Sequence, residues 1–222
     1  MTFGPRKIDQ IDAPPESGSL DFAVQLEPAS LQSSKERRKI VSETLQAIVR
    51  PVRYLISGDV QLEIEWLVHE RCRYESDTSP DVDNIVKPLL DALCGPNGLL
   101  IDDCQVQALE CHWIDWTQEQ QVSFRLRFMP EEWVSKDSLI FAHIGRNLYL
   151  PFNQIGSQKA ELLALDMLHE MVTLRDQIET QTRDYSAVRR FMPIQRPFHK
   201  SRLRDFDLRE LDDLRDALRS AK

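Results

Sequence analysis

Acidic side chains are concentrated in one short stretch of the chain that otherwise has the composition of a protein core. Residues 81–103 contain five aspartates and one lysine: Asp81, Asp83, Asp91, Asp102, Asp103 and Lys87. Crowding carboxylates costs free energy unless a positive charge offsets them. Carboxylate oxygens are ligands that Mg²⁺ prefers in proteins. We therefore expect this stretch to bind a divalent cation.

The spacing of these residues indicates phosphodiester chemistry. Asp81 and Asp83 are two residues apart just before a predicted helix, so that both carboxylates can converge on one ion. A bound Mg²⁺ ion activates water and neutralises charge on a phosphodiester that is being hydrolysed. Lys87, about one helical turn after Asp83, is placed to hold an acidic neighbour or to stabilise negative charge on phosphate. Asn84 is placed to orient a carboxylate or a water.

Helical periodicity predicts how the stretch positions these side chains. In a helix over residues 84–94, the apolar residues occupy one side, and Asp83, Asn84, Lys87 and Asp91 gather within about 100° of arc on the other. Pro88 lacks a backbone donor, which predicts a bent start to the helix. A turn at residues 95–98 follows, and Asp102 and Asp103 then precede a predicted strand.

The flanking sequence predicts the elements that carry this helix. Alternating apolar residues predict strands near 22–26, 59–66, 105–116 and 121–128, and a further helix is expected over 35–50. The last two strands are separated by a short polar turn, which predicts that they pair as a hairpin. The order strand, helix, strand, helix, strand, strand predicts an α+β fold. We expect a small mixed sheet with helices packed on one face.

Three regions of different character are expected along the chain. Residues 1–20 contain prolines without apolar periodicity and predict a flexible leader. Residues 21–130 form the predicted α+β domain. Residues 131–222 predict a mainly helical C-terminal extension of unknown role, with a long amphipathic helix near 157–180 that serves either as core or as a dimer interface.

Charge is distributed unevenly between these regions. The net charge is −8, and residues 1–130 carry 13 basic against 21 acidic residues, whereas residues 131–222 carry 15 of each. Within the second part, residues 183–204 hold seven basic residues and one acidic residue. Either this segment contacts nucleic-acid phosphates or its arginines pair with acids of the first domain. The candidate nucleic-acid-binding residues are Arg189, Arg190, Arg196, Lys200, Arg202 and Arg204.

The remaining composition predicts a cytoplasmic protein without membrane contact. No run of about 18 apolar residues occurs, and the first residues lack the apolar segment of a signal peptide. The four cysteines form no C-x-x-C pair, and a chain of 222 residues does not need disulfides to hold a core. We expect reduced thiols, and the spacing of cysteine and histidine does not favour a zinc site.

The spacing of the acidic stretch resembles that of a known family. The pattern Asp-x-Asp-Asn-x-x-Lys-x-x-x-Asp-Ala-Leu from Asp81, a glycine turn, and then Asp-Asp-x-Gln-Val from Asp102 is similar to the RusA family of Holliday-junction resolvases. The order of elements over residues 21–130 agrees with it, and nothing after about residue 130 is covered. The resemblance implies a small homodimeric endonuclease that depends on Mg²⁺, with Mn²⁺ as a substitute, and cuts branched DNA in recombination and repair.

The resemblance also implies roles for individual residues. Asp81, Asp83 and Asp103 correspond to metal ligands and Lys87 to the catalytic lysine, with Asn84, Asp91 and Asp102 in supporting positions. Two alternatives remain open from the sequence. One is a non-catalytic DNA- or protein-binding module that keeps the fold and a metal pocket, and the other is a hydrolase of small phosphate substrates, which would suit an acidic surface.

Overall fold

The computed structural model describes residues 5–76, 80–192 and 195–220. The chain divides into two compact units, Met1–Trp133 and Val134–Lys222. Each unit has its own hydrophobic core. The acidic stretch lies wholly in the first unit, which is therefore the unit that positions the candidate site.

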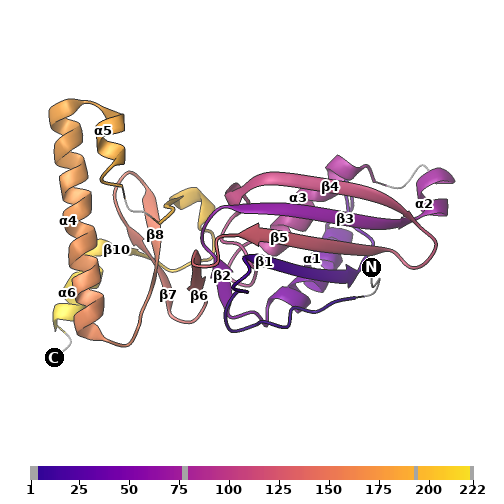
Figure 1. Cartoon of the computed structure of the whole chain (residues 1–222), viewed down its shortest axis with the longest axis horizontal. Coiled ribbons are helices and arrows are strands. Elements are labelled where there is room, and N and C mark those ends of the chain that lie inside the picture. The colour runs from indigo at the N-terminus through magenta and orange to yellow at the C-terminus, as the bar shows by residue number, and fades with distance from the viewer. Residues whose placement is uncertain (1–4, 77–79, 193–194, 221–222) are drawn as a thin grey trace. The chain divides into compact units, whose positions relative to one another are not determined.

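The first unit is an α+β fold, as the sequence predicts (Figure 1). Its elements are β1 (Ser19–Gln25), α1 (Lys35–Val49), β2 (Tyr54–Ile56), β3 (Val60–His69), α2 (Glu70–Tyr74), α3 (Val82–Leu93), the 3₁₀ turn η1 (Asp103–Gln105), β4 (Val106–Trp116) and β5 (Gln121–Phe128). Before β1, Arg6 and Ala23 exchange two backbone hydrogen bonds of 2.9 and 3.0 Å, and the side chain of Ile8 is buried.

The main sheet has the strand order β1-β5-β3-β4 and is mixed. β5 is antiparallel to both β1 and β3, so that Phe124 lies opposite Phe22 on one side and Ile64 on the other. β4 runs parallel to β3, with Trp113 opposite Trp66. Stacking of these two indole rings, with centroids 5.3 Å apart, joins the two strands further.

The predicted hairpin between the last two strands is wrong, because β3 lies between β4 and β5. The connection from β3 to β4 is long and contains α3, which is the kind of crossover that parallel pairing requires. β4 therefore takes one edge of β3, and β5 pairs with its other edge. The short polar turn after Trp116 crosses over the end of β3 and does not close a hairpin.

Helices α1 and α3 cover one face of this sheet, as predicted (Figure 1). The alternation in β3 explains why, since Val60, Leu62, Ile64 and Trp66 are at most 2% exposed. α3 presents its own apolar side to the same core, and Ile85, Leu89 and Leu93 are fully buried. The polar side of α3, which carries the acidic stretch, is left facing away from the sheet.

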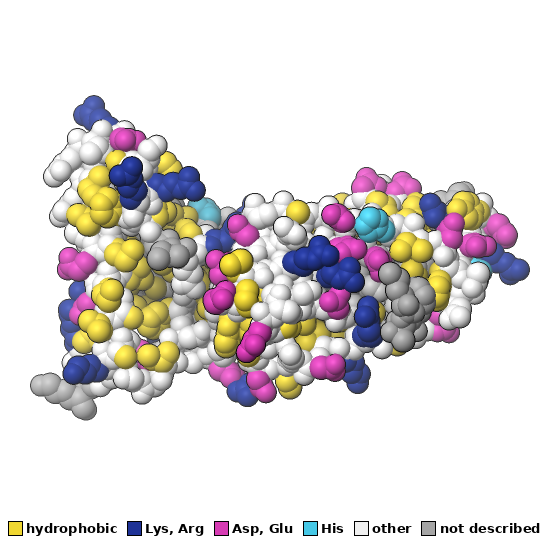
Figure 2. Space-filling model, viewed as in Figure 1, with side chains coloured by type: hydrophobic (Ala, Val, Ile, Leu, Met, Phe, Trp, Pro, Cys, Tyr) yellow, Lys and Arg dark blue, Asp and Glu magenta, His cyan; other side chains and the backbone are white. Residues whose placement is uncertain are grey.

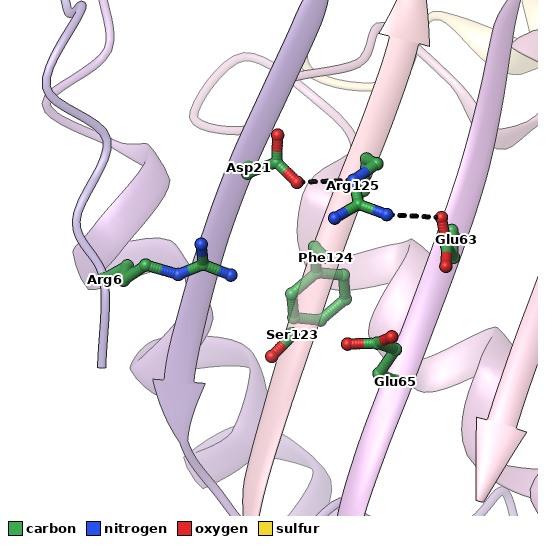
Figure 3. Close-up of a pocket in the computed structure, with 7 residues that line it drawn as sticks. All are labelled: Arg6, Asp21, Glu63, Glu65, Ser123, Phe124 and Arg125. Carbon is green, nitrogen blue, oxygen red and sulfur yellow. Dashed lines mark hydrogen bonds and ion pairs between the residues drawn. The ribbon is translucent and has the colours of Figure 1, made fainter. Parts of the chain in front are cut away.

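The other face of the sheet is open and carries charges of both signs (Figure 2). The Arg125 guanidinium donates to Asp21 on β1 at 2.7 Å and to Glu63 on β3 at 3.0 Å (Figure 3). These ion pairs connect three strands across the sheet. They also explain why alternate residues of β5, which face this side, are polar.

The second unit combines helices with a sheet of strand order β10-β7-β8-β9. Its elements are β7 (Leu139–His143), β8 (Leu148–Asn153), α4 (Gln158–Thr182), α5 (Tyr185–Arg189), β9 (Phe198–His199), the 3₁₀ turn η2 (Lys200–Arg202), β10 (Leu208–Glu210) and α6 (Leu211–Ser220), while β6 (Trp133–Ser135) spans the boundary between the units. The helical content was predicted, whereas the strands were not.

The long helix of the second unit, α4, agrees closely with the predicted range. One side of α4, which includes Leu165, packs into the core of the unit. Next to it, Asp166 accepts hydrogen bonds from Arg215 and Arg219 of α6 at 2.7 and 2.9 Å. On another side, Leu163 and Met167 are 63% and 60% exposed. Core packing therefore accounts for one side of α4 only.

Among the described residues, every helix is too short or too polar to cross a membrane. The four cysteines are free thiols, as expected.

Candidate active site

The first turn of α3 holds two exposed carboxylates. Asp81 is the N-cap residue, and its side chain makes no capping hydrogen bond to the helix. Asp83 lies in the first turn, where its Oδ1 accepts a long hydrogen bond of 3.5 Å from Asn84 Nδ2. Negative side chains are favourable at a helix N-terminus, which helps to fix this arrangement.

Pro88 lies inside α3, and the surrounding loop compensates for its missing N–H group. In an unbroken helix the amide of residue 88 would donate to the carbonyl of Asn84. Here the amide of Leu31, in the loop before α1, donates to the Asn84 carbonyl at 3.1 Å. The loop before α1 is thereby attached to the helix that carries the acidic residues.

Lys87 connects α3 to the turn that precedes β4. Its ammonium donates to Asp91 Oδ1 and to Asp103 Oδ2, both at 2.6 Å. Burial lowers the pKa of Lys87, but hydrogen bonds to Asp103 and Asp91 outweigh burial and raise it above its usual value. Sequence spacing predicted Asp91 as a neighbour, and the structure adds Asp103, which is 16 residues away in sequence.

Asp103 lies in η1, and this turn is held by its flanking residues. Asp102 caps the turn, accepting from the Cys104 amide at 3.0 Å. Gln105 completes a reciprocal capping box, because its Oε1 accepts from the Asp102 amide at 3.1 Å. Asp102 therefore holds the turn that bears Asp103.

Gln105 is a positioning residue that reasoning from the sequence missed. It is fully buried, and its Oε1 also accepts from the Ile101 amide at 2.8 Å. Its Nε2 donates to the carbonyls of Ile56 and Gly58 at 2.8 and 2.7 Å. This one amide thus ties the turn that bears Asp103 to the loop before β3. Its place in the Asp-Asp-x-Gln pattern was the only indication in the sequence.

Cys94 lies close to the cluster at the end of α3. Burial, followed by the negative charges of Asp103, Asp102 and Asp91, raises the pKa of its thiol well above the usual value. Without a bound metal, the thiol is therefore protonated.

Comparison with known proteins identifies the family. The family model described as Endodeoxyribonuclease RusA matches residues 12–127, which is more than half of the chain. The chain belongs to the RusA family. Among curated proteins, none matches the chain significantly. The match covers every residue of the acidic stretch and confirms the resemblance seen in its spacing.

RusA nucleases depend on a divalent metal, and the donor set of this RusA-family chain fits a hard cation. Within the described part of the chain, Asp81 and Asp83 offer carboxylate oxygens without strong competing hydrogen bonds, and Asp103 offers a third carboxylate that is about one-fifth exposed. All are oxygen donors of the type that Mg²⁺ prefers. These three carboxylates are not gathered within 4.8 Å of one another. Among the described residues, a different group has its possible ligand atoms that close together.

That second group lies on the open face of the sheet and consists of Glu63, Glu110 and His112. Glu63 already accepts from Arg125 at 3.0 Å (Figure 3). It also lies 3.7 Å from the Arg127 guanidinium. A cation bound here would have to compete with two arginines. The face is also on the opposite side of the sheet from α3, so the acidic residues of the RusA pattern take no part in this group.

The predicted nucleic-acid-binding residues belong to the second unit, beyond the RusA match. Arg189 ends α5, Arg190 caps it, and both are exposed, as are Lys200, Arg202 and Arg204. Arg196 is half-buried, and its guanidinium lies over the Phe198 ring at 5.8 Å. The chain thus presents exposed basic residues outside its acidic first unit.

Proposed function

We propose that this RusA-family chain is a Mg²⁺-dependent endonuclease that hydrolyses phosphodiester bonds in branched DNA during recombination and repair. The observation that supports this most strongly is the contact of Lys87 with both Asp91 and Asp103. It joins the two halves of the RusA pattern, which are separated in sequence, into one polar surface. Mn²⁺ is the proposed substitute for Mg²⁺, and the proposed active form is a homodimer.

The proposed roles follow from the environment of each side chain. Asp81, Asp83 and Asp103 would hold the metal, which when bound supplies Lewis-acid activation of the phosphate and of water. Asn84 is placed to orient the Asp83 carboxylate, and Asp102 holds the turn that bears Asp103.

Lys87 supplies the fixed positive charge of the site. Its ammonium is held between two carboxylates and has three donors, two of which the hydrogen bonds to Asp91 and Asp103 use. The remaining N–H group is free to donate to a non-bridging phosphate oxygen. Negative charge that grows on that phosphate during hydrolysis would then be stabilised by a group that is already in place.

The acidic balance of the first unit requires positive charge from elsewhere for DNA affinity. Neutralising phosphates supplies much of the binding free energy of proteins to DNA. Arg189, Arg190, Arg196, Lys200, Arg202 and Arg204 are the proposed phosphate contacts of the second unit.

A panel of substrates tests the proposal. The full-length protein would be incubated with labelled four-way junctions, flaps, linear duplex and free nucleotides, with Mg²⁺, with Mn²⁺ or with a chelator. Nicking of branched DNA that requires the metal is the expected result. Salt-sensitive binding without turnover would instead favour the non-catalytic module, and turnover of nucleotides alone would favour a small-phosphate hydrolase.

A further inference from the structure

A groove between α1 and α3 adjoins the candidate site. It has a volume of about 260 Å³. The side chains that line it include Lys35, Arg38, Lys39 and Ser42 of α1 and Pro88 and Asp91 of α3. We call it the α1–α3 groove. It lies on the helical side of the first unit, away from the open sheet face.

The α1 wall of this groove is a basic stripe. Lys35, Arg38, Lys39 and Ser42 follow the spacing i, i+3, i+4 and i+7, which places them on one side of a helix. The adjoining side of α1 packs into the core through Val41, Leu45 and Val49. The stripe therefore directs three positive charges and a hydroxyl into one concave surface of a unit that is acidic overall.

Two of these cations have no ion-pair partner among the residues that the structure describes. Lys35 and Arg38 form no side-chain ion pair in the described part of the chain. The Nε atom of Arg38 is buried and has no hydrogen-bond acceptor among the described residues, which is unfavourable for a buried donor. The neighbouring Arg37, by contrast, is paired with Glu27 at 2.5 Å. The positive charges of Lys35 and Arg38 therefore remain available in the groove to an anion from outside the chain.

The groove is continuous with the proposed catalytic residues. Asp91 lines the groove and also accepts the hydrogen bond from Lys87, whose ammonium bonds Asp103. The negative charge of Asp91 is therefore already compensated where the groove begins. A polyanion that lay along the basic stripe would reach the acidic stretch without crossing an unpaired carboxylate of α3.

We propose that the α1–α3 groove binds the sugar–phosphate backbone of DNA next to the phosphodiester that is cleaved. This inference rests on the proposed function and names the part of the first unit that holds the substrate. Phosphate oxygens accept from guanidinium, ammonium and hydroxyl groups, all of which the stripe provides. Because such contacts do not read bases, the groove fixes the position of the strand and adds no sequence preference.

Two adjacent arginines of α1 provide a matched test. Arg38→Gln removes the unpaired charge in the groove, and Arg37→Gln removes the same charge one residue away, where it is paired with Glu27. Binding of the full-length variants to a labelled four-way junction would be measured without divalent metal over a range of KCl concentrations. Nicking would be measured separately with Mg²⁺. Lys35→Gln, at an exposed position, serves as a second groove variant.

Arg38→Gln is expected to weaken junction binding by about tenfold and to lower the slope of log affinity against log salt by about one. Lys35→Gln should act in the same direction, and Arg37→Gln should stay within about twofold of the unmodified protein. If the Arg37 and Arg38 variants bind alike while the unmodified protein binds and nicks, the groove inference is overturned and the proposed function stands.

The two proposals can also separate in the other direction. An unmodified protein that binds the junction and loses affinity on Arg38→Gln, but nicks nothing with any metal, would support the groove and contradict the nuclease. Protein that neither binds nor nicks any branched DNA would overturn both.

Discussion

Replacement of Gln105 by leucine should destabilise the first unit far more than replacement of Gln107 by leucine. Gln105 is fully buried and makes four hydrogen bonds to backbone groups of Ile56, Gly58, Ile101 and Asp102. Leucine has a similar volume, so that loss of these bonds, rather than a cavity, dominates the effect.

The magnitude follows from the number of bonds. Each intramolecular hydrogen bond contributes about 1 kcal/mol net, so loss of four predicts a decrease of about 4 kcal/mol in the free energy of unfolding. Domains of this size are stable by roughly 5–15 kcal/mol in total. Gln105→Leu should therefore leave a unit that folds marginally, with the turn that bears Asp103 poorly held.

Urea denaturation followed by tryptophan fluorescence is the appropriate assay. All four tryptophans lie in the first unit, so the signal reports this unit and not the second. Gln107→Leu is the matched control, because Gln107 is exposed and its hydrogen bonds to Asp59 and Cys104 are long, at 3.4 Å. It should change stability by less than about 0.5 kcal/mol. Equal effects of the two replacements would refute the role assigned to Gln105.

Two further changes test the packing around the site by the same urea assay. In Gly98→Ala, the added Cβ would lie 2.1 Å from the Leu93 carbonyl, so we expect a loss of about 2 kcal/mol or more; a loss under about 0.5 kcal/mol would contradict this close approach. Arg125→Gln removes ion pairs to Asp21 and Glu63 whose side chains are 35% and 19% exposed, so we expect a loss of about 1 kcal/mol or less that shrinks at high salt. A salt-independent loss would show that packing, rather than charge, carries the effect.

Periodic segments of the first unit were predictable from the sequence. The helix over residues 35–50 and the strand near 59–66 have regular apolar spacing, and both form, as α1 and β3. The prediction that Lys87 and Asp91 are neighbours on the polar side of α3 is also confirmed. These features depend on local periodicity alone, which the sequence displays directly.

Strand pairing was not predictable in the same way. β4 and β5 are neighbours in sequence, which favoured a hairpin, but β4 is largely exposed and lies at an edge, with Leu109 42% exposed. β5 buries even polar residues such as Gln121 and Ser123, because it lies between two strands. The length of the connection through α3 was the feature that favoured parallel pairing of β4 with β3.

Contacts between residues far apart in the chain could not be predicted from the sequence for a related reason. The bond from Lys87 to Asp103 depends on how η1 packs, and η1 is held by a buried glutamine that hydropathy patterns place at the surface. The unpaired state of Arg38 likewise depends on which acids lie nearby in space. The strands of the second unit's sheet are short, two of them having only two or three residues, and show too little periodicity to be recognised.

The most direct test of the proposed nuclease is the metal-dependent nicking of a four-way junction by matched aspartate variants. Asp83→Asn removes one proposed metal ligand without changing side-chain size, and Asp9→Asn makes the same change at an exposed position outside the acidic stretch. We predict that, with saturating protein and Mg²⁺, Asp83→Asn slows nicking by at least about a hundredfold, whereas Asp9→Asn leaves the rate unchanged. Equal nicking rates for the Asp83 and Asp9 variants would contradict the assignment of the metal site to this stretch.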